Sequence, residues 1–211
     1  MIRQDRNRRF WNRIADRYAA RQLKDLPAYE AMLQNTAARL SSSDRVLEIG
    51  CGTGGTAIRL APGVAEWIAT DFSQEMVRIA RAKPSGENVR FKVADAAEAL
   101  TGGPYDAICA FNVLHLVDDL PAILARVHAS LHPNGQLISK TWCFAEVSPW
   151  LRVGFRVLRT LGLFPVARSL TQAQLRQAMR DAGFEITEQR VFGAYPQNPY
   201  IVAQRPMKPE T

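Results

Sequence analysis

The segment that most constrains the fold is residues 46–55, which read Val-Leu-Glu-Ile-Gly-Cys-Gly-Thr-Gly-Gly. An apolar run with β-branched residues passes into closely spaced glycines, and a helical pattern follows over residues 56–60. This order predicts a buried strand, a tight turn and the N-terminus of a helix. Because glycine has no Cβ, such a turn lets backbone N–H groups and the helix dipole approach a ligand closely. The segment therefore predicts a site for a nucleotide-like cofactor.

The glycine spacing fits two classes of cofactor site. Gly50, Gly52 and Gly55 satisfy the dinucleotide pattern G-x-G-x-x-G, whereas Gly54 as the third glycine gives the tighter pattern G-x-G-x-G. In the dinucleotide class an acid about 20 residues further on binds the ribose. Asp71 closes the next apolar run and could accept both ribose hydroxyls in either class.

Two further features separate these readings. Glu48 stands two residues before the first glycine, where dinucleotide enzymes usually carry a small or apolar residue. Residues 91–96, Phe-Lys-Val-Ala-Asp-Ala, predict a third strand that ends in Asp95. A carboxylate there suits the exocyclic amine of an adenine, so the pattern favours an adenosyl cofactor.

Successive motifs along the chain resemble those of class I S-adenosylmethionine-dependent methyltransferases. They are residues 48–54, Asp71-Phe72-Ser73 with Met76, residues 94–96, residues 105–115 and the turn over residues 131–137. The chain resembles most the small-molecule type that is compared with ubiquinone and menaquinone methyltransferases. The resemblance covers residues 10–141, with weaker agreement toward the C-terminus. Five motifs in the family's order make it specific.

Strand and helix patterns alternate along the chain. Helices are predicted from residue 53 and over residues 5–21, 27–40, 73–82, 120–131 and 171–182, with Thr171 as N-cap and Gly183 closing the last one. Strands are predicted over residues 45–49, 65–70, 89–94, 105–111, 135–142, 184–191 and 200–204. This alternation predicts a doubly wound α/β fold with a parallel sheet. The family resemblance implies a mostly parallel, Rossmann-like sheet of seven strands whose last strand is antiparallel.

We expect a single methyltransferase domain over residues 1–211. Its parts are N-terminal cap helices over 1–41, a cofactor-binding core over 42–142, a helical lid over 143–170, and a C-terminal helix and strand pair over 171–211. A chain of 211 residues with 47% hydrophobic residues can bury the core of one such domain.

The resemblance implies a role for each strand-end residue. The backbone of Gly50, Cys51, Gly52 and Gly54 would cradle the amino acid part of S-adenosyl-L-methionine, and Glu48 would hold this loop and reach the amino end. Asp71 would accept the ribose hydroxyls. Phe72 and Met76 would sandwich the adenine.

The remaining candidate residues lie around the adenine and the methyl group. Asp95 would accept from the adenine amine while the Ala96 N–H donates to a ring nitrogen. The family commonly uses the position of Asn112 to contact the methionine end. His115 is a candidate general base for an acceptor hydroxyl, or a structural residue. Tyr18 resembles the aromatic lid of related enzymes and would cover the sulfonium through cation–π attraction.

No metal site is predicted. His128 and His132 stand at i,i+4 spacing, and we expect them to share one face of a helix. The chain has no H-E-x-x-H pattern and no third ligand near them, so both are interpreted as surface residues of a helix C-terminus. The three cysteines, Cys51, Cys109 and Cys143, show no C-x-x-C spacing and predict buried, reduced thiols in a cytoplasmic protein.

The charge is concentrated outside the cofactor motifs. The net charge is +7, and residues 1–24 contain eight Arg or Lys against two Asp. Residues 144–170 contain four Arg against one Glu, with Arg152, Arg156 and Arg159 forming one stripe of an amphipathic helix. This helix is expected to be a lid over the acceptor pocket, with peripheral membrane contact through residues 148–162 as a further possibility. Otherwise it packs on the sheet with a solvated arginine side.

The predicted function is methyl transfer to a small, apolar or aromatic acceptor by in-line displacement. A nicotinamide-dependent oxidoreductase is the first alternative, but the chain has no Tyr-x-x-x-Lys pair. A nucleic-acid methyltransferase is the second, although residues 111–114 lack the Asn/Asp-Pro-Pro-Tyr signature, so we expect no nucleic-acid partner. No apolar run approaches the ~20 residues of a transmembrane helix, and the first residues lack the apolar region of a secretory signal.

Overall fold

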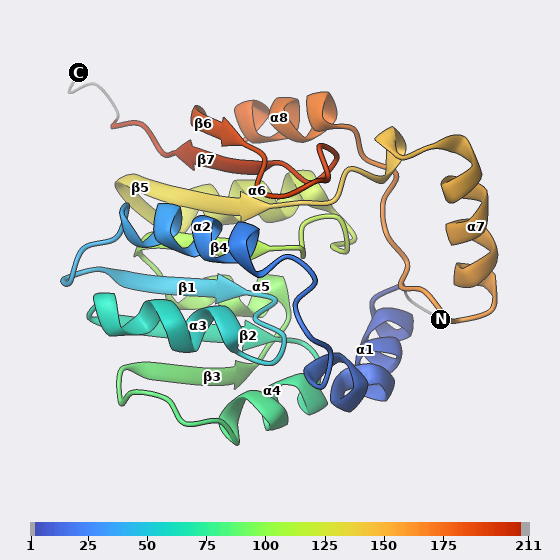
Figure 1. Ribbon diagram of the computed structural model, residues 1–211. Helices are drawn as coiled ribbons and strands as arrows, with labels where there is room; N and C mark the ends of the chain where they lie inside the picture. Colours follow the sequence, from blue (N-terminus) through green and yellow to red (C-terminus); the bar gives the residue numbers. More distant parts are fainter. Residues whose placement is uncertain (1–2, 208–211) are drawn as a thin grey trace.

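The computed structural model describes residues 3–207 and contains one seven-stranded sheet in the order β3-β2-β1-β4-β5-β7-β6 (Figure 1). The strands are β1 (Arg45–Ile49), β2 (Glu66–Asp71), β3 (Val89–Val93), β4 (Tyr105–Phe111), β5 (Leu131–Lys140), β6 (Glu185–Arg190) and β7 (Tyr200–Gln204). The neighbouring pairs β3–β2, β2–β1, β1–β4 and β4–β5 are parallel, whereas β7 is antiparallel to both β5 and β6. The predicted fold class, a doubly wound and mostly parallel seven-stranded sheet, is confirmed.

Helices cover both faces of the sheet. They are α1 (Arg3–Ala19), α2 (Leu26–Ala37), α3 (Gly55–Leu60), α4 (Gln74–Arg81), α5 (Ala96–Ala99), α6 (Leu120–Ala129), α7 (Pro149–Thr160) and α8 (Gln172–Asp181). Short 3-10 turns follow α3, α5 and β5, at Ala61–Gly63, Leu100–Gly102 and Phe144–Glu146 respectively. Buried residues of α2, α3 and α4 form one core cluster with the sheet, and those of α5, α6 and α8 form the other. By contrast, α1 and α7 lie beyond the carboxyl ends of the parallel strands (Figure 1).

The central strands are buried on both faces, which explains why they appear in the sequence as nearly continuous apolar runs. In β1, Leu47 and Ile49 belong to one core cluster and Val46 to the other. Side chains alternate between faces along a strand, so a five-residue strand supplies both cores. β1 is thereby fixed in the middle of the sheet, with its carboxyl end pointing toward α1.

Most element boundaries follow the predictions, and two differences have local causes. Strand β5 begins at Leu131, so His132 lies in a strand and the prediction that it shares a helix face with His128 was wrong. Among residues 3–207, no cluster of His, Cys, Asp or Glu is placed to hold a metal ion. The four-residue helix α5 was not predicted, because so short a helix leaves no periodic pattern. Thr171 caps α8 as expected, in a reciprocal capping box with Gln174.

No helix within residues 3–207 combines the length and the apolar content needed to span a bilayer.

Candidate active site

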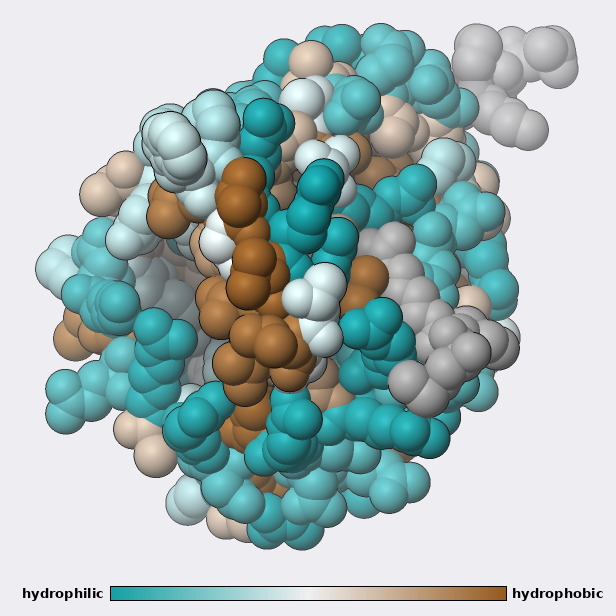
Figure 2. All heavy atoms as spheres, turned by 90° about the vertical axis from the view of Figure 1, so that its right-hand side faces the viewer, coloured by the Kyte–Doolittle hydropathy of each residue, from teal (hydrophilic) through white to brown (hydrophobic). Residues whose placement is uncertain are grey.

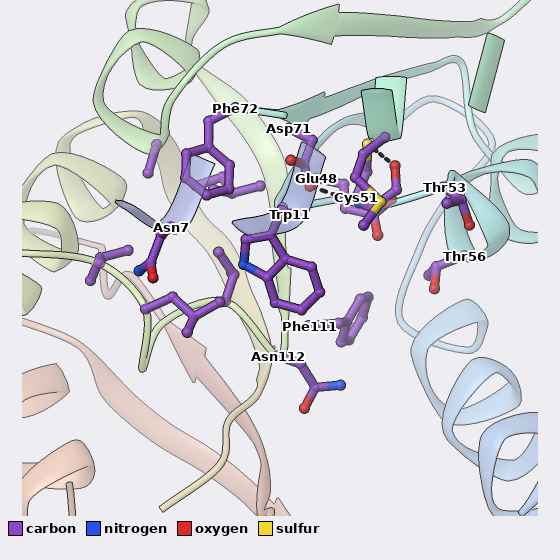
Figure 3. A pocket seen from close by; sticks show the side chains of 18 of the residues that line it. Asn7, Trp11, Glu48, Cys51, Thr53, Thr56, Asp71, Phe72, Phe111 and Asn112 are labelled. Atoms are coloured by element: carbon purple, nitrogen blue, oxygen red, sulfur yellow. Dashed lines mark hydrogen bonds between the residues drawn. The ribbon is translucent and has the colours of Figure 1, made fainter. Parts of the chain in front are cut away.

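A cavity of about 840 Å³ lies at the carboxyl ends of β1, β2 and β4 (Figure 3). In the sheet, β2 and β3 lie on one side of β1, and β4 and the later strands lie on its other side. The order of the strands therefore reverses at β1, and the cavity lies at this switch point. Open α/β sheets bind their ligands at this point. Its volume lies within the range of about 300–1,000 Å³ that is usual for small-molecule and cofactor sites.

The turn between β1 and α3 forms one wall of the cavity. Gly50, Gly52 and Gly54 all have positive φ angles, of 71°, 54° and 77°. A Cβ on Gly50 would lie 2.7 Å from Val113 Cγ2, and one on Gly54 would lie 2.8 Å from Phe91 Cε1. The turn therefore needs glycine for its conformation and for the space around it. Gly54 is the N-cap of α3 and faces Phe91, whereas the other two glycines line the cavity.

Asp71 holds this turn against the end of β2. Its Oδ2 accepts a hydrogen bond from the Gly52 N–H at 2.9 Å, and its Oδ1 accepts one from the Ser73 N–H at 2.9 Å. Burial raises the pKa of Asp71 to about 6, although both hydrogen bonds act to lower it. Each oxygen keeps a lone pair, so the carboxylate can accept further hydrogen bonds from a ligand in the cavity.

Glu48 is a second buried carboxyl group on the cavity wall (Figure 3). Its Oε2 accepts a hydrogen bond from Trp67 Nε1 at 3.1 Å. Burial, with a smaller contribution from the negative charge of Asp71, raises the pKa of Glu48 to about 8, although the Trp67 hydrogen bond acts to lower it. A bound cation would lower this pKa, so the pair of acids can offer negative charge to a positively charged ligand.

The other predicted adenine-side residues gather at the same cavity. Phe72, Met76, Asp95 and Ala96 all line it. Asp95 caps α5, and its Oδ1 accepts the Ala97 and Glu98 N–H groups at 2.8 Å each. Its Oδ2 accepts a hydrogen bond from Gln4 Nε2 at 2.9 Å. Burial acts to raise the pKa of Asp95, but these hydrogen bonds lower it overall, so the group stays ionised.

Helix α1 closes the cavity from outside the sheet. Its residues Gln4, Asn7, Trp11 and Tyr18 line the cavity. The Tyr18 ring lies above the glycine turn, since a Cβ on Gly52 would be 3.8 Å from Tyr18 Cε1. Burial and the charge of Asp71 raise the pKa of Tyr18, so its hydroxyl remains protonated.

The sequence analysis did not identify Gln4, Asn7 or Trp11 as candidate site residues. A signal was present, because positions 4, 7 and 11 follow the spacing of the helix face that also carries Tyr18. Trp11 and Tyr18 make an edge-to-face contact, with ring centroids 5.8 Å apart. The two rings therefore form one aromatic surface toward the cavity.

Asn112 and His115 follow β4, but only Asn112 lines the cavity. Asn112 has a φ of 57°, a conformation that few residues other than glycine adopt, and its N–H donates to the Lys140 carbonyl at 2.6 Å. His115 is buried, and its ring packs against Phe144 with centroids 5.4 Å apart. This placement favours a structural role for His115 over a role as general base.

Two lysines were also missed. Lys83 lines the cavity and donates from Nζ to the Thr53 carbonyl at 2.6 Å, and burial lowers its pKa. Lys140 lines the opposite side and donates to the Phe192 carbonyl at 3.4 Å. Lys140 ends β5, so its position at a strand end was a usable signal.

The expected lid over residues 143–170 does not cover the cavity. None of these residues lines it. Helix α7 packs instead through Phe155, whose ring lies 5.5 Å from that of Phe144 and 4.7 Å from that of Phe164. The sequence pattern identified an amphipathic helix correctly, but the side on which it packs depends on these aromatic contacts.

Residues 11–189 match the family model described as a methyltransferase domain. The chain belongs to this family. It is 35% identical over 141 residues to the biotin biosynthesis bifunctional protein BioCD of Bordetella avium, covering 64% of this chain and 30% of the relative. It is 33% identical over 132 residues to the methyltransferase calH of Penicillium decumbens, covering 56% and 35%. The chain thus spans about a third of the length of these curated relatives.

Solved structures with the same fold agree with the family assignment. The magnesium protoporphyrin IX methyltransferase ChlM of Synechocystis, solved with bound SAH, matches with a TM-score of 0.67 and 24% identity, over 95% of this chain and 93% of that one. An S-adenosylmethionine-dependent methyltransferase of Mesorhizobium loti matches with a TM-score of 0.70 and 19% identity, over 84% and 98%. At these identities the likeness establishes the fold.

Proposed function

We propose that the cavity binds S-adenosyl-L-methionine and that the protein transfers the methyl group to a small, apolar or aromatic acceptor. The observation that carries this proposal is the convergence of the glycine turn, Asp71 and Glu48 on one cavity in a member of the methyltransferase family. Membership of the methyltransferase family supports this proposal over a nicotinamide-dependent oxidoreductase.

The residues present fit this cofactor. The Gly50–Gly54 turn offers backbone N–H groups to a carboxylate. A Cβ at Gly50 would lie 2.7 Å from Val113 Cγ2, so the turn can take this position only because residue 50 is glycine. Asp71 has lone pairs left for ribose hydroxyls, and Phe72 and Met76 supply apolar surface for the adenine. Asp95 would accept from the adenine amine beside its hydrogen bond from Gln4.

The cofactor supplies a methyl group already activated by a sulfonium. The protein therefore needs to align the acceptor in line with that methyl group and to exclude water. Trp11 and Tyr18 offer ring faces and edges on the α1 side, where cation–π attraction favours a sulfonium by about 1 kcal/mol. Asn112 would fix the methionine end.

The rest of the cavity wall supports an apolar or aromatic acceptor. Its apolar lining at the end of β4 and on α6 is formed by Phe111, Val113, Leu116, Val117 and Ile123. The relatives include enzymes of small-molecule metabolism, among them the porphyrin methyltransferase and several polyketide synthases. These relatives support a small organic acceptor over a nucleic acid.

A thermal shift series tests cofactor choice. S-adenosylmethionine and its demethylated product, each at about 100 times its Kd, are expected to stabilise the protein by about 2.7 kcal/mol, whereas NAD and NADP leave the melting temperature unchanged. Labelled methyl transfer is then screened over quinols, phenols, fatty acids, DNA and RNA. Stabilisation by NAD alone, or labelling of nucleic acid alone, would contradict the proposal.

A further inference from the structure

Helix α7 carries an exposed apolar stripe that the candidate active site does not use. Trp150, Val153, Val157 and Leu161 recur at helical spacing and are 87%, 59%, 51% and 65% exposed. Figure 2 views the side of the molecule on which α1 and α7 lie, and hydrophobic side chains gather there in a stripe. Single exposed apolar residues are ordinary on a protein surface, but a contiguous patch of them indicates an interaction site.

The stripe points away from the rest of the protein. The inner side of α7 is already packed, because Phe155 stacks on Phe164 and makes an edge-to-face contact with Phe144. In a helix with 3.6 residues per turn, positions 150, 153, 157 and 161 fall on the side opposite Phe155. A Cβ on Gly154, between them, would meet no atom within 4 Å. The stripe is therefore free to contact a surface outside the molecule.

The charged residues of α7 are all positive, and most of those on the neighbouring helix α1 are positive too. Helix α7 carries Arg152, Arg156 and Arg159 and no acidic residue. The neighbouring helix α1 adds Arg6, Arg9 and Arg13, which lie along the segment that follows α7. Arg6 donates to the Arg159 carbonyl at 3.4 Å, and Arg13 donates to the Gly162 carbonyl.

The acids of α1 are engaged elsewhere and do not neutralise this face. Asp5 pairs with Arg8 at 2.8 Å, and Asp16 pairs with Arg78 at 3.1 Å. A second copy of the chain would bring the same positive charges against these arginines, so self-association through this face is opposed by repulsion. An anionic surface complements it.

We propose that α7, with the arginines that flank it, docks the protein on an anionic lipid surface. The stripe enters the boundary between headgroups and acyl chains, and the arginines bind lipid phosphates. Trp150 lies at the start of the helix, and its amphipathic ring suits this boundary. The contact is peripheral and does not depend on the identity of the methyl acceptor.

Vesicle cosedimentation tests this proposal. Wild-type protein is expected to bind vesicles of phosphatidylcholine with about one-third phosphatidylglycerol and to leave pure phosphatidylcholine vesicles unbound. The variant Trp150→Ser/Val153→Ser/Val157→Ser is expected to lose binding. The variant Arg156→Gln/Arg159→Gln is expected to bind with a partition coefficient about 30-fold lower, at about fivefold per arginine.

Met207→Ser is the matched control, because Met207 is an exposed apolar residue that follows β7, and antiparallel β7 ends at the sheet edge away from α7 (Figure 1); this variant is expected to bind like wild type. Circular dichroism confirms that each variant is folded. Absence of wild-type binding at low salt, or unchanged binding by the triple Ser variant, would overturn the proposal. Two other results would also overturn the proposal. One is a wild-type dimer, detected by light scattering, that the triple Ser variant no longer forms. The other is wild-type protein that binds an acidic protein in a cell lysate through this face without any lipid.

Discussion

Asp71 connects three parts of the candidate site through one carboxylate. It ends β2, holds the glycine turn through the Gly52 N–H, and holds the start of α4 through the Ser73 N–H. Its position after an apolar run made it predictable as a strand-end acid. The hydrogen bonds to the two backbone N–H groups were not predictable, because they depend on how the turn after β1 approaches β2.

Replacing Asp71 by Ala removes both hydrogen bonds and the acceptor for the ribose. We expect Asp71→Ala to lose about 1–3 kcal/mol of stability and most of the thermal shift produced by S-adenosylmethionine. The shift is measured against each variant's own ligand-free melting temperature. Asp44→Ala is the control, since Asp44 bonds the Ser41 N–H outside the cavity and its variant keeps the shift. A full shift in Asp71→Ala would remove the ribose assignment.

Glu48 makes stability depend on pH in a direction opposite to that of an ordinary paired acid. Burial raises its pKa to about 8 from the usual 4.5, so the folded protein holds the proton more tightly than the unfolded chain. Stability therefore falls as pH rises from about 4.5 to about 8. Glu48→Gln keeps an acceptor for Trp67 and carries no charge, so we expect it to gain a few kcal/mol over wild type at pH 8 and little at pH 4. Urea unfolding of both proteins across this range measures the difference, and a constant difference would contradict the assignment.

His115 shows where residue chemistry alone did not decide a role. Its position after β4 and its ordinary pKa suited a general base, but the packing on Phe144 places the ring away from the cavity wall. We expect His115→Phe to keep methyl transfer to the acceptor found in the screen within about twofold, with an unchanged pH profile. Loss of a general base would lower the rate by about 10²–10⁴-fold, and such a loss would restore the catalytic role.

At the scale of elements, the turn between β1 and α3 is the most tightly constrained part of the cavity. Gly54 combines a φ of 77° with a 2.8 Å approach to Phe91. We expect Gly54→Ala to destabilise the protein by about 1–3 kcal/mol and to weaken cofactor binding. Gly63→Ala is the control, because a Cβ there meets no atom within 4 Å. Chemical unfolding compares the two, and equal stabilities would show that the turn tolerates a side chain.

The elements differ in how far the sequence could predict them. The bounds of β1, β4 and β7 agree with the prediction, because each is an apolar run flanked by polar or turn residues. Helix α7 was predicted as amphipathic, but its direction of packing was not. The contacts of Phe155 with Phe144 and Phe164 join residues on three separate segments, and a local pattern contains no information about such contacts.

At the scale of the whole molecule, the sheet order places the carboxyl ends of β1, β2 and β4 around one cavity. The sequence predicted this edge, because the motifs end successive strands of a parallel sheet. It did not predict that α1 would form the outer wall with Asn7 and Trp11, since that wall depends on long-range contacts. Asn12 Oδ1, for example, accepts a hydrogen bond from Ser73 Oγ at 2.6 Å.

The same helix connects the cavity to the proposed lipid-docking face. Asn7 lines the cavity and exchanges two hydrogen bonds with the backbone of Val166, at 3.0 Å and 2.8 Å. Val166 follows α7 in the chain, so α1 is shared by the two regions. Docking and cofactor binding can nevertheless be measured separately, because vesicle binding needs no turnover.

Isothermal titration calorimetry with S-adenosylhomocysteine tests the central claim most directly. We predict saturable binding of one ligand per chain, lost in Asp71→Ala and retained in the Asp44→Ala control. The product lacks the methyl group, so the result does not depend on knowing the acceptor. No heat of binding in the folded wild-type protein, or saturable binding of NAD in its place, would contradict the proposal that this cavity holds an adenosyl sulfonium cofactor.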